Sequence, residues 1–232
     1  MTDSGYVQAQ YSTESGLETR TSVWRDSLDG RNPATIAADA VRAERPARIL
    51  EVGCGTGGFA ARLASDNPEA ELIATDQSAR FVELTAARGL VARQADVQDL
   101  PFDDASYDVV AAMWMLYHVP DLDQGLAEVR RVLKPGGLFV AVTNGDDHLA
   151  DLMTEAGGTR LVTQFSRENG AVALRRHFDD VTTEHVDTRA VFENHSGAVA
   201  YLASFDDQVA AQLPAFEGSR EYGGRTTVFL AR

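Results

Sequence analysis

The chain has 232 residues, of which 44% are hydrophobic and 24% are charged, a composition typical of a globular protein with a sizeable buried core. Because 35 Asp and Glu outweigh 21 Lys and Arg, the formal charge of -14 argues against nucleic acids and anionic membrane surfaces as partners. The charge favours a small molecule, a cation or another protein.

Cysteine content and the N-terminal sequence bear on location. Cys54 is the single cysteine, so no internal disulfide can form. The start, MTDSGYVQAQ, lacks the basic and apolar regions of a secretory signal. The longest apolar run, residues 109–117, is far shorter than the roughly 20 residues of a membrane-spanning helix. We expect a cytoplasmic protein that does not enter a membrane.

The first half of the chain alternates between helical and strand patterns. Short apolar runs that stop at a glycine or an acid predict strands at 47–52, 72–75 and 90–95. Apolar residues at helical spacing predict helices at 36–44, 57–65 and from Ser78, a typical N-cap, to Gly89, a typical C-terminal cap. Strands that alternate with helices predict a parallel, doubly wound α/β sheet.

The second half continues this order and then changes character. The nearly continuous apolar run 107–115 predicts a central strand covered on both faces. A helix at 122–133 ends at Lys-Pro-Gly-Gly, ahead of a strand at 138–143. Beyond Asn144 we expect antiparallel additions at the sheet edge, made of helices at 148–156, 166–177 and 197–205 and strands at 181–186 and 226–231.

A glycine-rich loop separates the first expected strand from the helix after it. The segment ILEVGCGTGGF at 49–59 leaves the helix N-terminus open to a ligand. Gly53, Gly55 and Gly58 also fit the dinucleotide spacing GxGxxG, so an NAD(P)-dependent reductase is an alternative. Glu51 places a carboxylate just before the loop, which would repel a pyrophosphate and tolerate an ammonium or sulfonium group.

Two further acids end the next two strands. Asp76 follows the glycine loop by about 20 residues, the position from which a carboxylate accepts hydrogen bonds from both hydroxyls of a ribose. Asp96 could accept from the exocyclic amine of adenine. Either acid alone could be an ordinary helix cap, but the two together with Glu51 favour a nucleoside pocket.

Four stretches together resemble class I S-adenosylmethionine-dependent methyltransferases of the small-molecule type, which have no separate target-recognition domain. They are EVGCGTGGF at 51–59, TDQS at 75–78, QADVQDLPF at 94–102, and YDVVAAMWMLYHVPD at 107–121 with RRVLKPGG at 130–137. The resemblance spans roughly residues 47–144. It implies a Rossmann-like doubly wound sheet of seven strands, mostly parallel with the last antiparallel, and helices on both faces.

The resemblance also implies the cofactor, the reaction and the domain organisation. S-adenosyl-L-methionine would supply a methyl group to an oxygen, nitrogen or carbon of a small organic molecule, such as a secondary metabolite. Residues 1–34 would form an N-terminal lid over the single cofactor-binding domain 35–232. The cofactor-binding residues would be Tyr11, Arg20, Glu51, Gly53, Cys54, Gly55, Gly57, Asp76, Gln77, Asp96, Val97 and Met113. Tyr11 would close on the cofactor, and Arg20 would either pair with its methionyl carboxylate or be an ordinary surface residue.

Several side chains around the expected cleft have two interpretations each. His118 directly follows the fourth strand and is our first candidate for a general base, although the alternative that it packs or bonds to backbone is favoured. Trp114 and Tyr117 either wall the acceptor site or belong to the core. Asn144 and His148 either contact substrate or form a turn and a cap.

Metal and thiol chemistry have less support. His177, His185 and His195 match no compact ligand spacing, so we expect no metal. Cys54 lies near a helix N-terminus, where its thiol pKa could fall. Two further alternatives keep the nucleoside pocket: a non-enzymatic S-adenosylmethionine-binding regulatory protein, and an enzyme that uses the sulfonium to promote a cyclisation.

Overall fold

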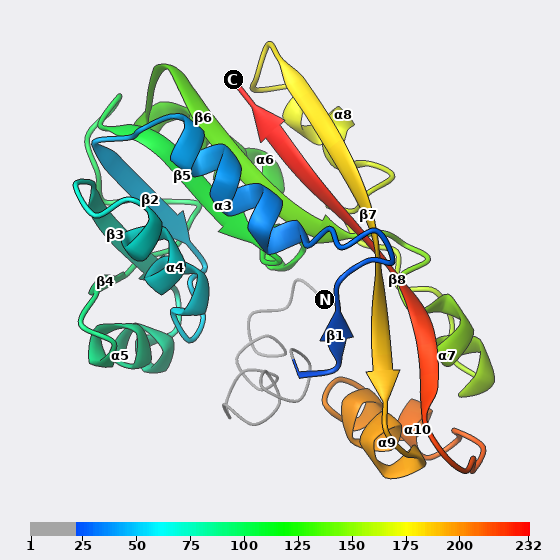
Figure 1. The fold of residues 1–232 in the computed structure, drawn as a ribbon. Coiled ribbons are helices and arrows are strands. Elements are labelled where there is room, and N and C mark those ends of the chain that lie inside the picture. The colour runs from blue at the N-terminus through cyan, green and yellow to red at the C-terminus, as the bar shows by residue number, and fades with distance from the viewer. Residues whose placement is uncertain (1–21) are drawn as a thin grey trace.

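The computed structural model describes residues 22–232, so Tyr11 and Arg20 lie outside the described residues. Eight strands form one sheet in the order β1-β7-β8-β6-β5-β2-β3-β4 (Figure 1). They are β1 (Trp24–Arg25), β2 (Arg48–Val52), β3 (Glu71–Asp76), β4 (Val91–Gln94), β5 (Tyr107–Met113), β6 (Leu133–Asn144), β7 (Val181–Phe192) and β8 (Arg220–Ala231).

Strand directions follow the predicted topology. β2 to β6 pair with one another in parallel, whereas β8 is antiparallel to both β6 and β7. All seven predicted strands are present, and the last is antiparallel as expected. The prediction of seven strands is nevertheless one too few, because β1 pairs antiparallel with β7 at Trp24 and Ala190. A strand of two residues has too little alternation to be recognised in a sequence.

The helices lie mostly where helical spacing predicts them. They are α3 (Pro33–Ala43), α4 (Gly58–Asp66), α5 (Ala79–Ala87), the short 3-10 helix η1 (Leu116–His118), α6 (Leu122–Val132), α7 (Ala150–Glu155), α8 (Gly170–Leu174), α9 (His195–Ala203) and α10 (Asp207–Ala210). Ser78 caps α5 by accepting from the Phe81 amide, and Gly89 beyond its end has a φ of +82°. The predicted helix 166–177 is too long, since only 170–174 are α-helical.

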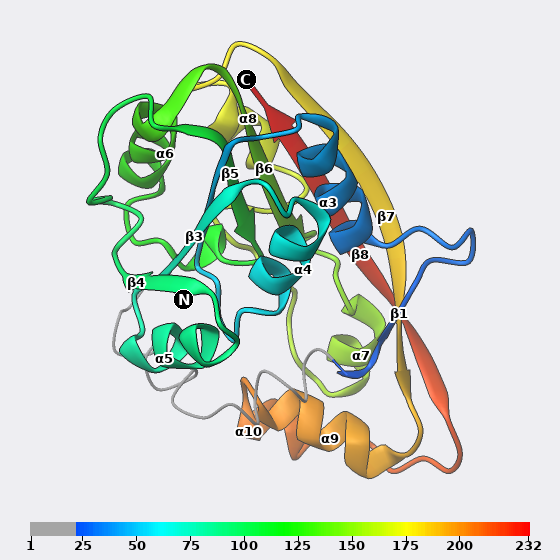
Figure 2. The same cartoon turned by 60° about the vertical axis from the view of Figure 1, so that its left-hand side comes forward.

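Helices cover both faces of the sheet, as Figures 1 and 2 show. On one face α3 and α4 bury Val41 and Leu63 against Ile49 and other apolar residues of the central strands. On the opposite face α6 and α8 bury Leu126 and Leu174 in a second cluster. Burying a side chain of this size stabilises the fold by about 1.5–3 kcal/mol.

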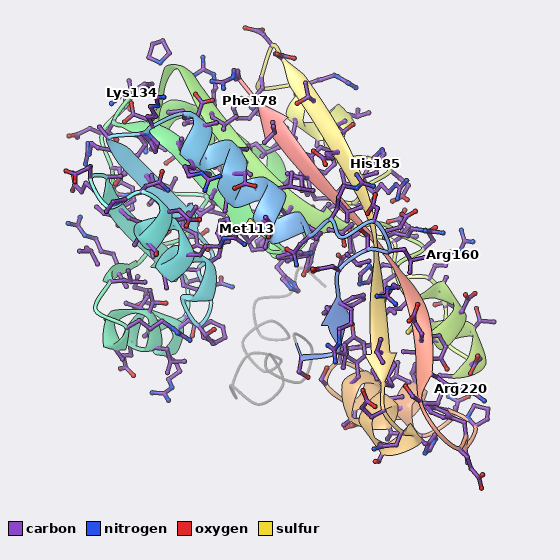
Figure 3. All side chains as sticks on the ribbon, viewed as in Figure 1. Met113, Lys134, Arg160, Phe178, His185 and Arg220 are labelled. Atoms are coloured by element: carbon purple, nitrogen blue, oxygen red, sulfur yellow. The ribbon has the colours of Figure 1, made fainter. Side chains whose placement is uncertain are left out.

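β7 and β8 are much longer than predicted, and their extension shapes the site. Residues 187–192 pair with 220–225 beyond Asn144, where β6 ends. The extension packs with β1, α7, α9 and α10 around a third apolar cluster that includes Phe192 and Leu202. Figure 3 shows Met113 at the end of the sheet that faces this extension and Lys134 at the opposite end. The extension therefore lies beside the carboxyl ends of the parallel strands.

Candidate active site

The loops that follow the parallel strands line one cavity of about 940 Å³. Its walls come from the turns after β2, β3, β4, β5 and β6, together with residues of the β7–β8 extension, α7 and α9. An open α/β sheet binds its ligands at this edge, because the helix N-termini and the loops converge there.

The glycine loop after β2 needs glycine for conformation and for space. Gly53, Gly55 and Gly57 have φ angles of +69°, +52° and +76°, a region that side chains disfavour. A Cβ on Gly53 would lie 2.7 Å from the Met115 side chain, and one on Gly57 would lie 2.7 Å from Thr85 Oγ1. The loop backbone therefore lies in close contact with the Met115 and Thr85 side chains, and it forms part of the cavity wall.

Asp76, at the end of β3, holds this loop in place. Its carboxylate accepts from the backbone N–H groups of Gly55 and Ser78, each at 2.9 Å. Burial raises the pKa of Asp76, and these N–H bonds oppose that shift. Each carboxylate oxygen has two lone pairs, so each can accept a second hydrogen bond from a ligand.

Glu51 is a buried acid in the cavity wall with an unused oxygen. The residue is 1% exposed, and no described residue bonds to its Oε2. Burial, and secondarily the charge of Asp76, raises the pKa of Glu51 to about 8. A buried carboxyl without a partner is unfavourable, so this position suits a ligand that brings a cation or a hydrogen-bond donor.

The predicted fall in the pKa of the Cys54 thiol is wrong. Burial raises its pKa to about 12, and the charges of Glu51 and Asp76 add to the effect. The hydrogen bond with Thr85 opposes the shift without reversing it. Cys54 Sγ lies 3.4 Å from Thr85 Oγ1, and the thiol forms part of the cavity wall.

The turn after β4 contributes the third predicted acid. Asp96 is exposed, and its carboxylate accepts from the backbone and side-chain N–H groups of Gln98. Val97 beside it is buried and lines the cavity. Gln77 also lines the cavity, and its backbone carbonyl accepts from Gln94 Nε2 at 2.8 Å. The structure thus brings the acids of the two strand ends to one cavity.

The segment after β5 forms the middle of the cavity. Met113 is buried, and Trp114 adopts a left-handed backbone with a φ of +51°. Such a conformation costs about 1–3 kcal/mol for a non-glycine residue, and it aims the indole at Asn144, to which Trp114 Nε1 donates at 3.0 Å. His118 in η1 is half-buried beside the Tyr117 ring and lines the same cavity.

Most residues in the wall opposite the glycine loop were not predicted from the sequence. Trp24, which was not predicted, packs at a tilt of 34° against His148, which was, with ring centroids 4.7 Å apart, and both residues line the cavity. The other missed residues in this wall are Leu149, Met153, Thr188, Tyr201 and Phe205. Apolar spacing marks these segments as packed, but only the length of the β7–β8 extension brings them to the strand ends.

Known proteins identify the family. A family model described as a methyltransferase domain matches residues 50–141. A malonyl-[acyl-carrier protein] O-methyltransferase from Herminiimonas arsenicoxydans is 32% identical over 187 residues, which are 75% of this chain and 69% of that relative. The chain belongs to the class I S-adenosylmethionine-dependent methyltransferases.

Other members of the methyltransferase family match over shorter stretches. A demethylmenaquinone methyltransferase from Deinococcus radiodurans is 38% identical over 110 residues, 45% of either chain. The chain spans less than half the length of several curated relatives that it matches. The solved structure of the [4+2]-cyclase SpnF shares the fold, with a TM-score of 0.61 and 20% identity over 98% of this chain and 94% of that one.

The cavity fits S-adenosylmethionine, the methyl donor of this family. Asp76 keeps acceptor capacity for hydroxyls, and the unpartnered Oε2 of Glu51 suits a cationic group. Gly53 and Gly55 keep the loop backbone at the cavity wall, where a ligand can contact it.

Proposed function

We propose that this methyltransferase transfers the methyl group of S-adenosylmethionine to an oxygen, nitrogen or carbon of a small organic molecule, such as a secondary metabolite. The observation that carries the proposal is the single cavity of about 940 Å³, which extends from Asp76 to Asn144 and His148. A cavity of this size lies near the upper end for small-molecule sites, so a nucleoside cofactor and a small acceptor can bind side by side.

The cofactor-binding residues are assigned by chemistry. Asp76 accepts from the ribose hydroxyls, and Asp96 with the buried Val97 binds adenine, while Gln77 lies between them. The remaining contacts, with the methionyl part, come from Glu51, Gly53, Cys54, Gly55 and Met113, whereas Gly57 is not among the residues that line the cavity. Tyr11 and Arg20 lie outside the described residues, and their place in a lid formed by residues 1–34 stays a prediction.

The main contribution of the protein to methyl transfer is to align the acceptor with the methyl group. S-adenosylmethionine supplies an activated methyl group on a good leaving group, and the chain must hold the acceptor in line with it and exclude water. His118, half-buried at the cavity wall, is the proposed general base for an acceptor that is still protonated at neutral pH.

The test is turnover with a panel of small molecules. Purified protein is incubated with S-adenosylmethionine and each compound, and mass spectrometry quantifies S-adenosylhomocysteine and methylated product. A regulatory protein would bind the cofactor and release no S-adenosylhomocysteine with any compound. A cyclase would rearrange a compound without consuming the cofactor. Tight NADH binding without S-adenosylhomocysteine binding, measured by calorimetry, would contradict the proposal.

The proposal extends to partners and location. The charge of -14 supports a small-molecule acceptor over a nucleic acid. No helix in residues 22–232 is long and apolar enough to cross a membrane. A cytoplasmic location is supported by the buried free thiol of Cys54, which suits a reducing compartment.

A further inference from the structure

The turn after β6 presents two polar side chains to the acceptor side of the cavity. Asn144 and His148 both line the cavity, and both are anchored to the same stretch of β8. The Thr226 hydroxyl donates to Asn144 Oδ1 at 3.1 Å, and the backbone N–H of Arg225 donates to His148 Nδ1 at 3.0 Å. The shared anchor fixes the position of the two side chains relative to each other.

Partner chemistry sets the orientation of the Asn144 amide. Its Oδ1 accepts from Trp114 Nε1 at 3.0 Å as well as from Thr226. An indole N–H can only donate, so the oxygen of the amide must face it, and the amide cannot be reversed. No described residue accepts from Nδ2, which leaves the NH₂ group of Asn144 as a donor at the cavity wall.

The backbone of Arg225 sets the tautomer of His148. The N–H and C=O of one strand residue point to the same side, and the Arg225 C=O accepts from Gly145 at 2.8 Å, so both groups face the turn after β6 and away from β7. Because β6 ends at Asn144, His148 Nδ1 is the acceptor available to the Arg225 N–H. His148 Nδ1 lies 3.0 Å from both the N–H and the C=O of Arg225. Because the C=O already accepts from Gly145 whereas the backbone N–H requires an acceptor, the tautomer with the lone pair on Nδ1 and the hydrogen on Nε2 satisfies both groups.

Burial keeps this imidazole neutral. It lowers the pKa of His148 to about 4, although the Arg225 backbone and, to a lesser degree, the charge of Asp147 oppose the shift. The Arg225 guanidinium forms ion pairs with Asp147 and Asp187, which offset its charge. The two donors at this wall are therefore uncharged.

We propose that Asn144 Nδ2 and His148 Nε2 form a fixed pair of hydrogen-bond donors for a carbonyl oxygen of the methyl acceptor, and that the acceptor is an apolar, ring-bearing molecule. This inference rests on the proposed function and names its substrate class. Two neutral donors suit a neutral carbonyl, because they supply no charge to balance a carboxylate. The ring would lie against the apolar wall that Trp24, Leu149 and Met153 build beside His148.

The tautomer gives a test that needs no substrate. Nitrogen-15 NMR of the imidazoles, with His148→Asn to assign the signal, reports which ring nitrogen carries the hydrogen at pH 7. We expect the hydrogen on Nε2. A hydrogen on Nδ1 would overturn the proposal, because the ring would then present a lone pair to the cavity.

Binding of two matched probes tests the donor pair itself. 2-Acetylnaphthalene carries a carbonyl, and 2-ethylnaphthalene has the same skeleton without the oxygen. Their affinities are measured by ligand-observed NMR on protein saturated with S-adenosylhomocysteine. We expect wild type to prefer the ketone by about tenfold, the value of one to two good hydrogen bonds.

Two conservative variants should abolish that preference. Asn144→Asp keeps an oxygen for Trp114 and Thr226 but replaces the donor with an acceptor. His148→Asn can keep an acceptor for Arg225 but removes the Nε2 donor. Both should bind the hydrocarbon as wild type does. His177→Asn, on a ring that pairs with Asp123 away from the cavity, should retain the preference for the ketone.

The controls separate this proposal from the proposed function. Equal affinity of wild type for the two probes, with S-adenosylhomocysteine binding intact, would overturn the donor pair alone. A wild-type protein that does not bind S-adenosylhomocysteine would contradict the proposed function instead. The NMR measurement would still show which ring nitrogen of His148 carries the hydrogen.

Discussion

The backbone N–H of Gly55 donates to the carboxylate of Asp76 across 2.9 Å, so the acid expected to bind a ribose also fixes the glycine loop. The same carboxylate accepts from Ser78 at the start of α5. Loop shape and the proposed nucleoside recognition therefore rest on one side chain, and removal of that side chain should affect both.

Replacement of Asp76 tests nucleoside recognition. Asp76→Ala should weaken S-adenosylhomocysteine binding by more than about tenfold, because two hydroxyl hydrogen bonds to a charged acceptor, each worth roughly 1.5–3 kcal/mol, are lost. Isothermal titration calorimetry measures the affinity, and Asp39→Ala, exposed on α3 and outside the cavity, is the matched control. Unchanged affinity in the Asp76 variant would refute the assignment.

Adjacent glycines in the loop should respond differently to an added methyl group. Gly57→Ala should lower the free energy of unfolding by about 1–3 kcal/mol, because its φ of +76° disfavours a side chain and its Cβ would lie 2.7 Å from Thr85 Oγ1. The added methyl group of Gly58→Ala would enter open space in the first turn of α4, so this variant should raise the free energy of unfolding by at most about 1 kcal/mol. Urea unfolding compares the two, and equal losses would contradict the geometry.

Local sequence signals predict which strand ends gather on the glycine-loop side of the cavity. The apolar runs that end at Gly53, Asp76 and Asp96 belong to parallel strands, whose carboxyl ends share one edge of the sheet. Each signal lies within a few residues of the group it positions, so pattern and chemistry are enough.

The acceptor half depends on contacts that no local pattern contains. The Trp24 ring packs against His148, and His148 accepts a hydrogen bond from Arg225, although these residues are far apart in the sequence. Those contacts require β7 and β8 to continue past Asn144, a length that alternation over 181–186 does not reveal. The sequence indicates that Asn144 and His148 follow a strand, but not which atoms they present.

Chemical modification tests the environment of Cys54. With a thiol pKa near 12, roughly one molecule in ten thousand holds a thiolate at pH 8, so iodoacetamide should alkylate the folded protein far more slowly than a free cysteine. Mass spectrometry follows the reaction with and without urea. Rapid alkylation of the folded protein would indicate a lowered pKa, contrary to the structure.

Glu51 should make the stability of the ligand-free protein fall as pH rises. A glutamate carboxyl in the unfolded chain has its ordinary pKa of 4.5, whereas that of Glu51 in the folded protein is about 8, so between these values the unfolded chain ionises and the folded one stays protonated. Its contribution is fully present below about pH 4.5 and is lost as pH rises to about 8. Glu51→Gln should remove this dependence and raise the melting temperature at pH 8. A lower melting temperature there would contradict the burial of an uncompensated acid.

Cofactor binding should release the proton that Glu51 holds. A cationic group beside Oε2 favours the ionised carboxyl, so binding of S-adenosylhomocysteine, which carries an ammonium group, should lower the pKa of Glu51 below its ligand-free value of about 8. At pH 6.5 the proton then passes to the buffer, and the observed binding enthalpy depends on the ionisation enthalpy of that buffer. Calorimetry in phosphate and in Tris measures the number of protons released. Glu51→Gln should release fewer protons and bind more weakly, whereas equal proton release by wild type and variant would place the ammonium group elsewhere in the cavity.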